Sequence, residues 1–287
     1  MAILLLLYFV RYEMTDKYKN TRPEILVVND DGFRAKGIHE LAHLMREYGN
    51  VTVVAPYEPQ SGKSVSLTLD KPLMIDEPVK KRATSKLGRL RVYTLTGTPA
   101  DCAKLGINIF INEGHLPDLV VSGINHGSNA SAAAIYSGTL GAAAEAAIYG
   151  IPAIGLSINT HSPDADFTAV LALSRQIVEK VLEGDLRRGI YLNVNFPDMP
   201  LEQIRGIRLA RQGNGRWVRE FDHRITLRGK HYFWMVGEFE DEEPVGSDDA
   251  DHHLVDGGYV SIVPHRLDTT DYEELERLRS LWKFDIR

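Results

Sequence analysis

The chain has 287 residues, of which 44% are hydrophobic and 25% charged, as is typical of a globular protein with one large domain or one domain plus a smaller appendage. The formal net charge is -6 and the basic residues are scattered, which excludes a surface built to coat nucleic acid. The single cysteine, Cys102, excludes an internal disulfide framework and a cysteine-based zinc site, and it is compatible with a cytoplasmic location.

Residues 1–23 are expected to form an N-terminal extension outside the folded core. The apolar run from Ile3 to Val10 is too short to span a bilayer, and it lacks the basic start and cleavage site of a secretory signal. A polar segment begins at Met14, which favours Met14 as the natural start. If residues 1–13 are translated, they should be disordered or covered by a partner chain, so we expect no membrane association.

Residues 24–204 are predicted to form an α/β core. Ile25 to Val28 is an apolar run typical of a buried strand, residues 38–45 show helical spacing, and Val51 to Val54 predicts a second strand. This βαβ pattern implies a right-handed crossover and a parallel sheet. Further strands are predicted at 64–69, 89–96, 119–121, 151–157 and 190–196, with helices after residue 101, at 140–149 and at 167–182. We therefore expect a Rossmann-like three-layer sandwich with a mostly parallel sheet.

An acidic pair follows the first predicted strand directly. Asp30 and Asp31 lie between that strand and Gly32, and in an open parallel sheet ligands bind at the carboxyl ends of strands. Such a pair is often only a turn. Two adjacent carboxylates near a core repel each other unless a cation shares the site, however, and their oxygens suit magnesium, manganese or calcium.

Two further strand ends are expected at the same edge of the sheet. The loop 58–64 after the second strand supplies Ser61, and the strand at 119–121 is followed by a small polar segment that supplies Asn125. With Asp30 and Asp31 they complete a set of two carboxylates and two neutral oxygens, with open positions for water and substrate. The hydroxyl and amide oxygens therefore strengthen the prediction of a metal site.

Ser137-Gly138-Thr139 precedes an alanine-rich helix. A plain N-cap is the commonest role for these residue types, but two hydroxyls and the free N–H groups of a first helical turn also form a site for a phosphate. Ser61-Gly62 could add a second small anion nest. We interpret the segment as a phosphate cradle.

The region 205–287 is predicted to be an appendage. Its pattern changes to alternating strands and turns, with an acidic loop at 238–251, a returning strand at 259–262 and a charged helix from Asp271. Exposed Trp217 and Trp234 are better explained by a hairpin that packs on a partner subunit than by RNA contact. The isolated His126 is interpreted as a polar loop residue, and the pair at 252–253 as a surface feature.

The chain resembles the SurE stationary-phase survival proteins, which are metal-dependent 5′/3′-nucleotidases and acid phosphatases. The resemblance runs from residue 24 to the C-terminal strand and rests on ordered blocks: Ile25 to Gly32, Val53 to Pro56 with Ser61-Gly62 and Ser66 to Leu69, Gly97 to Cys102, Val121 to Asn125, Tyr136 to Thr139, and Gly257 to Ile262. Between Asn129 and Tyr136 the chain carries alanines where the family commonly has Leu-Gly and an acidic residue. That segment is expected to border the substrate.

The resemblance implies roles for individual residues. Metal ligation is implied for Asp30, Asp31, Ser61 and Asn125, with one divalent ion, magnesium or manganese, per subunit. The phosphate side would be lined by Asn29, Gly62, Asn129, Ser137, Gly138 and Thr139, with Asn29, Asp30 and Asp31 as catalytic residues. It also implies a homo-oligomer, a dimer or a tetramer, in which the C-terminal hairpin or tail exchanges between subunits.

The expected activity is hydrolysis of nucleoside monophosphates by a metal-activated water that Asp30 or Asp31 orients or deprotonates. The main alternative is a magnesium-binding phospho-receiver domain without hydrolase activity. A receiver requires a phosphoacceptor Asp after the strand 119–121, where the chain has Ser122. A dinucleotide-binding protein would need a Gly-rich turn after the first strand, where Asn29 to Gly32 stands. Neither duplex nucleic acid nor a membrane is an expected partner.

Overall fold

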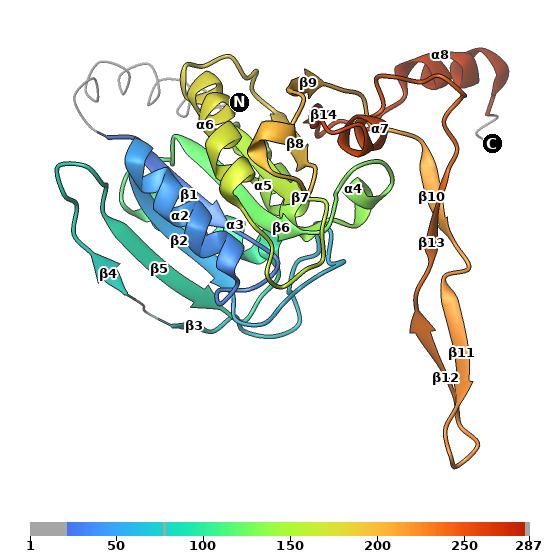
Figure 1. The fold of residues 1–287 in the computed structure, drawn as a ribbon, viewed down its shortest axis with the longest axis horizontal. Coiled ribbons are helices and arrows are strands. Elements are labelled where there is room, and N and C mark those ends of the chain that lie inside the picture. The colour runs from blue at the N-terminus through green and yellow to red at the C-terminus, as the bar shows by residue number, and fades with distance from the viewer. Residues whose placement is uncertain (1–21, 77–78, 285–287) are drawn as a thin grey trace.

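A mostly parallel sheet forms the centre of the computed structural model, which describes residues 22–76 and 79–284 (Figure 1). In the described part of the chain the strand order is β3-β5-β2-β1-β6-β7-β8-β14-β9, with β4 also paired to β5. Strands β3 and β4 run antiparallel to β5, and β14 runs antiparallel to β8, whereas the other neighbours are parallel. The prediction of a mostly parallel α/β sheet is confirmed.

The strands of the central sheet are β1 (Glu24–Val28), β2 (Asn50–Pro56), β3 (Ile75–Asp76), β4 (Lys80–Lys81), β5 (Leu90–Leu95), β6 (Leu119–His126), β7 (Ala153–Ile158), β8 (Ile190–Phe196), β9 (Ile207–Leu209) and β14 (Val260–Arg266). The helices are α2 (Lys36–Tyr48), α3 (Pro99–Asn112), α4 (Ala133–Tyr136), α5 (Gly138–Ile148), α6 (Thr168–Leu182), the 3-10 turn η1 (Leu201–Gln203), α7 (Asp251–Asp256) and α8 (Tyr272–Leu281).

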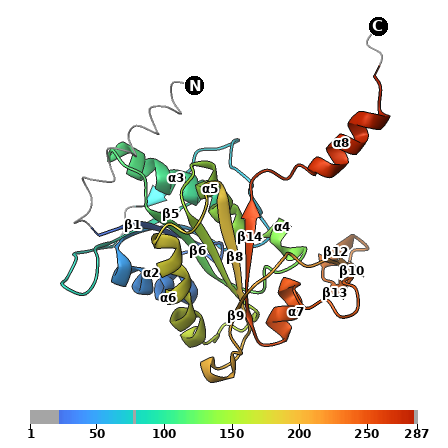
Figure 2. The same ribbon diagram turned by 90° about the horizontal axis from the view of Figure 1, so that it is seen from above.

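Helices cover both faces of the sheet, which gives three layers (Figure 2). Helices α2 and α6 contact each other on one face, and α3 and α5 on the other. Strand β1 lies between the two layers: Ile25 and Val27 belong to the core under α2 and α6, whereas Leu26 and Val28 belong to the core under α3 and α5. Because β1 is buried on both faces, its sequence is continuously apolar rather than alternating.

The predicted strand at 64–69 is wrong. Ser64 has a φ of 52°, and its backbone N–H donates to the carbonyl oxygen of Tyr136 at 3.0 Å. The backbone N–H of Thr68 donates to Asp101 Oδ1 at 3.1 Å. These bonds use backbone groups that a sheet ladder would need, so the alternating sequence folds as a loop against the starts of α3 and α5.

Several element boundaries also differ from the predictions. Strand β6 continues to His126, with an irregularity between Ser122 and Asn125, where a polar loop was expected. Helix α5 begins at Gly138 and is preceded by the short α4. The expected acidic loop at 238–251 is instead divided among strand β13, a connection and the start of α7.

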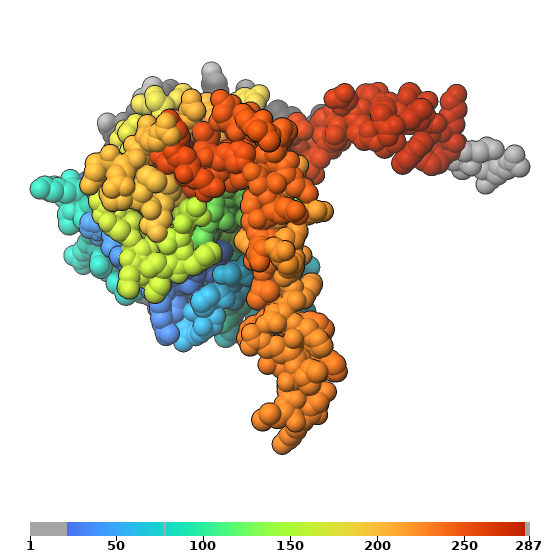
Figure 3. All heavy atoms as spheres, turned by 45° about the vertical axis from the view of Figure 1, so that its right-hand side comes forward, coloured from blue at the N-terminus to red at the C-terminus, as the bar shows by residue number. Residues whose placement is uncertain are grey.

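A long hairpin projects from the body between β9 and α7 (Figures 1 and 3). Its strands are β10 (Gly215–Val218) paired with β13 (Glu238–Asp241), and β11 (Phe221–Ile225) paired with β12 (His231–Met235), both antiparallel. Helix α8 forms a second arm that leaves the body after β14. The predicted hairpin is therefore present, while the boundary at residue 205 and its use for oligomerisation stay predictions.

The predictions for residues 1–21, including a start at Met14, lie outside the described residues. Within the ranges that the structure covers, no helix has both the length and the apolar character required to cross a membrane.

Candidate metal and phosphate site

Asp30 is a buried carboxylate at the end of β1. It is 4% exposed, and its pKa is raised to about 6, chiefly by burial; a hydrogen bond from Thr139 opposes this increase, and the negative charge of Asp31 contributes to it. That bond runs from Thr139 Oγ1 to Asp30 Oδ1 at 2.5 Å. Without a cation the charged form of Asp30 is therefore disfavoured, and a bound cation would reverse this.

Asp31 is partly exposed and is held by the end of β6. Both the backbone N–H and the Nδ1 atom of His126 lie 3.2 Å from Asp31 Oδ2. The interpretation of His126 as a polar loop residue is wrong, because His126 ends strand β6 and its ring packs edge-on against Phe167 at a centroid distance of 5.4 Å. Its position next to Asn125 at a strand end was the sequence signal for this contact.

Asn29 directly follows β1 and is fully buried. Its Nδ2 atom donates to the carbonyl oxygen of Gly32 at 2.9 Å, which fixes the turn after β1. Its Oδ1 atom is buried and has no hydrogen-bond partner among the described residues. A buried oxygen without a partner is costly, so this atom is suited to a bound cation or ligand.

The loop after β2 is tied to Asp30 by its backbone. The N–H of Gln60 donates to the carbonyl oxygen of Asp30 at 2.7 Å, and Ser61 and Gly62 follow directly and are exposed. Gly62 has a φ of 73°, and the space where a side chain would stand is open. The structure thus brings this segment beside β1, while the metal-ligand role of Ser61 stays a prediction.

Asn125 is buried near the end of β6, the other neighbour of β1 in the sheet. Its Nδ2 atom donates to the carbonyl oxygen of Gly127 at 2.7 Å, which leaves its Oδ1 atom to accept or coordinate. Because β1, β2 and β6 are parallel neighbours, their carboxyl ends meet at one edge of the sheet. The ligand role of Asn125 likewise stays a prediction.

The segment 137–139 places the start of α5 against Asp30. Ser137 is the N-cap, because its Oγ accepts from the N–H of Leu140 at 3.1 Å. A Cβ on Gly138 would lie 2.9 Å from both Asp30 Cβ and Pro99 Cγ, so only glycine fits there. The capping interpretation is therefore correct, and the same geometry directs the positive end of the α5 dipole toward the site.

Asn129 belongs to a buried polar network that was not predicted from the sequence. Its backbone N–H donates to Asn195 Oδ1 at 2.8 Å, and its Nδ2 to Ser157 Oγ at 2.7 Å. Asn193 Nδ2 donates to the carbonyl oxygen of Asn129 at 2.9 Å, and Asn195 Nδ2 to Asn193 Oδ1 at 2.9 Å. The Asn-x-Asn alternation in an otherwise apolar strand was the available signal. In the structure Asn129 positions the loop after β6, and its predicted contact with substrate is untested.

These residues fit a hard divalent cation. The side chains at and after the three strand ends carry carboxylate, amide and hydroxyl oxygens, which magnesium and manganese prefer. The unpartnered Asn29 Oδ1 and the raised pKa of Asp30 are the two observations on this chain that favour a cation there.

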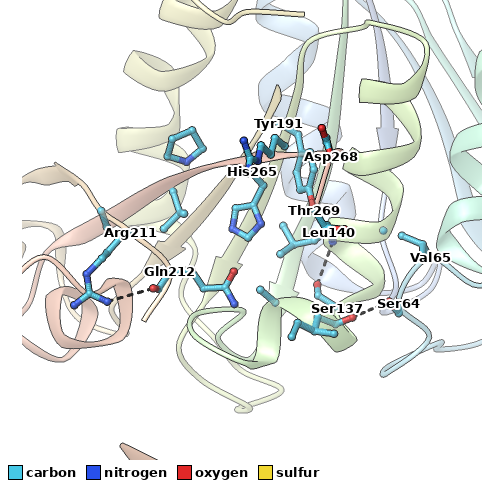
Figure 4. A pocket seen from close by; sticks show the side chains of 17 residues that line it. Ser64, Val65, Ser137, Leu140, Tyr191, Arg211, Gln212, His265, Asp268 and Thr269 are labelled. Carbon is cyan, nitrogen blue, oxygen red and sulfur yellow. Dashed lines mark hydrogen bonds between the residues drawn. The ribbon is translucent and has the colours of Figure 1, made fainter. Parts of the chain in front are cut away.

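A pocket of about 610 Å³ opens beside the start of α5 (Figure 4). Of the predicted site residues, only Ser137 lines it. Ala134 and Ile135 contribute from the segment expected to border the substrate, and Tyr191 and His265 contribute from β8 and β14. The pocket therefore adjoins the phosphate side of the site rather than the acidic pair.

The fold and the site define a Rossmann-like α/β protein that collects oxygen ligands and a helix N-terminus at the carboxyl edge of its sheet. The chain belongs to the SurE family: the family described as "Survival protein SurE" matches residues 25–219.

Comparison with known proteins supports this assignment over nearly the whole chain. A protein named 5′-nucleotidase SurE from Cytophaga hutchinsonii is 43% identical over 264 residues, which cover 92% of this chain and 98% of that protein. A protein of the same name from Phocaeicola vulgatus is 41% identical over 93% of this chain and 100% of that protein. The crystal structure of the SurE protein from Aquifex aeolicus has a TM-score of 0.73 at 36% identity and covers 90% of this chain and 99% of that one.

Proposed function

We propose that the protein is a divalent-metal-dependent phosphomonoesterase that hydrolyses nucleoside monophosphates, that is, a 5′-nucleotidase. The observation that carries this proposal is the buried Asp30 carboxylate, held by Thr139 at the first turn of α5. A cation bound to Asp30 and a phosphate bound by the helix start would lie side by side. The relatives named 5′-nucleotidase SurE, at about 40% identity, support the same activity.

The residues of the chain divide into those that would hold the metal and those that would hold the phosphate. Asp30, Asp31, Ser61 and Asn125 would bind one magnesium or manganese ion per subunit. When bound, this ion would supply Lewis acidity and lower the pKa of a coordinated water. Asn29, Gly62, Asn129 and the segment 137–139 would receive the phosphate oxygens.

The residues of the site would also divide the acid–base and charge-stabilising roles. Asp30 or Asp31 would orient the attacking water or accept its proton, and His126 would keep Asp31 in place for that role. The start of α5 would stabilise the charge on the phosphoryl oxygens through its free N–H groups. The nucleoside would extend toward the pocket beside Ser137, where the segment 134–135 forms part of the wall.

The remaining aspects of the proposal concern the protein as a whole. We place the enzyme in the cytoplasm, as a homo-oligomer assembled through its hairpin or tail. No observation favours the receiver alternative, because the position after Val121 holds the fully buried Ser122 and not an aspartate.

The test is hydrolysis of nucleoside 5′- and 3′-monophosphates and of an aryl phosphate by pure protein, measured as phosphate release. Activity should disappear in EDTA and return with magnesium or manganese. Absence of metal-dependent phosphate release under all these conditions would refute the proposal.

A further inference from the structure

A second group of metal-ligating side chains lies at the root of the hairpin, on β13 and α7. Asp241 ends β13, and His252 and His253 stand in the first turn of α7. The nearest ligand atoms of the three residues all lie within 4.8 Å of one another. We refer to these three residues as the hairpin-root cluster. The prediction that the histidine pair is a plain surface feature is wrong, because both rings are partly buried and face one carboxylate.

The cluster is arranged so that both Nε2 atoms point at Asp241. His252 Nε2 lies 3.0 Å from Asp241 Oδ1, and His253 Nε2 lies 2.7 Å from Asp241 Oδ2. The centroids of the two imidazole rings are 4.3 Å apart. Two imidazoles and one carboxylate therefore converge on one point from two different elements.

The hydrogen bonds of the Nδ1 atoms indicate which ring nitrogens carry protons. His253 Nδ1 lies 2.9 Å from the carbonyl oxygen of Ser247, which can only accept, so Nδ1 carries a proton. In a neutral ring Nε2 then presents a lone pair to the Asp241 carboxylate. Two acceptors at this distance repel each other unless a proton or a metal ion lies between them.

The second ring is not fixed to one tautomer, so its Nε2 atom can either donate to Asp241 Oδ1 or coordinate an ion. His252 Nδ1 is buried without a hydrogen bond to the described residues, and its nearest carboxylate oxygen is Asp251 Oδ1 at 3.5 Å. Metal-binding histidines commonly direct their outer N–H to a carbonyl or a carboxylate. A proton on the Nε2 atom of each ring would also satisfy Asp241 and needs only His253 to be an imidazolium. A divalent ion satisfies the same three groups by replacing both protons.

We propose that Asp241, His252 and His253 form a binding site for a divalent transition-metal ion, with zinc the best fit, which fastens the hairpin to α7. Two imidazole nitrogens and one carboxylate oxygen are a usual zinc ligand set, and a water would take the fourth tetrahedral position. Ligand atoms of a tetrahedral zinc ion with bonds of about 2.0–2.1 Å are roughly 3.3 Å apart. The separations of 2.7 and 3.0 Å run to the two different oxygens of Asp241 and are shorter than this by about 0.6 and 0.3 Å, so the exposed carboxylate would have to move outward to admit the ion.

The site is reachable from solvent and mechanically connected to the body. The Asp241 side chain is 44% exposed, so an ion has an open path to it. Next to it, buried Asp251 accepts from the backbone N–H groups of Gly213 at 2.9 Å and Ser131 at 3.0 Å. An ion in the cluster would thus fix the end of β13 to the helix whose first residue also holds the loop after β6.

The test measures metal binding by the metal-free full-length protein. Calorimetry measures zinc binding, and visible absorption measures the binding of cobalt(II) as a substitute for zinc. Two other histidine pairs must first be neutralised: His39 and His43 lie one turn apart on the exposed side of α2, and His223 Nε2 lies 2.7 Å from His231 Nδ1 near the hairpin tip. The background protein therefore carries H39Q, H43Q and H223Q. In it, Asp241→Asn and His253→Gln should each weaken one zinc site by at least about 10-fold, because loss of even an outer partner of a ligand costs about 10- to 100-fold.

A variant of the proposed catalytic site distinguishes zinc bound there from zinc bound at the hairpin-root cluster. Asp30→Asn in the same background should leave the hairpin-root zinc site unchanged, so this result is independent of the nucleotidase proposal. Equal zinc affinity and stoichiometry in the background protein and in both cluster variants would overturn the inference. Should the variants unfold, histidine ring NMR signals of the background protein provide the second measurement: zinc should shift those of residues 252 and 253, and unchanged signals would overturn it equally.

Discussion

At the scale of single residues, Asp30 is where the fold and the proposed chemistry meet. Asp30→Asn keeps the size of the side chain and an oxygen that can accept from Thr139 Oγ1, but it removes the charge that would hold the cation. We expect a loss of phosphate release of at least about 100-fold, by analogy with the removal of one preorganised electrostatic group. Circular dichroism should show an unchanged fold. Asp185→Asn, at an exposed position after α6, is the matched control and should keep full activity.

The same substitution makes a prediction about stability and pH in metal-free protein. Burial raises the pKa of Asp30 from 3.8 to about 6, so between these values the folded state binds more protons than the unfolded state. Stability from this group is present below pH 4 and is lost as the pH rises through 6. In EDTA, Asp30→Asn should therefore be more stable than the unsubstituted protein at pH 7, by up to about 3 kcal/mol, and the advantage should vanish near pH 4.

Urea unfolding of both proteins at several pH values measures this difference. A constant difference from pH 4 to pH 7 would contradict the prediction. Saturating magnesium should reverse the order at pH 7, because it binds the charged carboxylate and stabilises only the folded state.

Site residues could be predicted where they belong to a local sequence pattern, but not where a partner lies far away along the chain. Asp30, Asp31 and Ser137 stand directly after a strand or before a helix, so local pattern was enough to single them out. The partners that fix the site are remote: Asn195 is 66 residues from Asn129, and 120 residues separate Asp251 from Ser131. Such pairs form only when strands and loops assemble, so the Asn-x-Asn alternation in β8 could indicate a buried polar network but not the residue that it meets.

At the scale of elements, strand β8 supports the loop after β6 through Asn195. Asn195→Ala would leave the backbone N–H of Asn129 and the Oδ1 atom of Asn193 buried without their present partner. Since each unpaired buried group costs about 1–3 kcal/mol, we expect a loss of at least about 2 kcal/mol in the free energy of unfolding, read from urea titration.

Asn159→Ala is the control for this substitution. Asn159 is exposed after β7, and its side chain makes no hydrogen bond within the described ranges, so its removal should change the free energy of unfolding by less than about 0.5 kcal/mol. An effect of Asn195→Ala as small as that of the control would show that water replaces the lost network.

Element prediction succeeded where burial on two faces dictated the sequence and failed where other groups competed for the backbone. The run 25–28 has no alternative to a central strand, since both faces are covered by helices. The alternating run 64–69 looks equally extended, but Asp101 and the 134–136 turn take its N–H and hydroxyl groups. Those acceptors are fixed by the helices after them, so periodicity alone could not reveal the competition.

At the scale of the whole molecule, the hairpin exposes an apolar surface of the kind that is usually buried in an interface. Strands β11 and β12 carry large apolar side chains that no other part of the described chain covers. Phe221, Phe233, Trp234 and Met235 are 58–73% exposed. An exposed apolar patch of this kind marks an interface in a protein that remains in solution. We therefore expect it to be covered by a second copy of the chain.

Excision of residues 216–240, with Gly-Gly between Gly215 and Asp241, tests this expectation. These two residues face each other in the register of β10 and β13, so a two-residue turn closes the gap, and Asp241 keeps its place in the hairpin-root cluster. Truncation after residue 205 would not serve, because it removes β14 from the central sheet.

Light scattering behind a sizing column should show a smaller assembly for the excised protein than for the full chain. Magnesium binding should be retained, since the residues proposed to bind it all lie at or before Asn125. A point variant within the intact hairpin, Trp234→Glu, should weaken assembly in the same direction, because it places a charge in the apolar patch. If both proteins keep the full mass, the interface lies elsewhere, and the arm that carries α8 becomes the next surface to test.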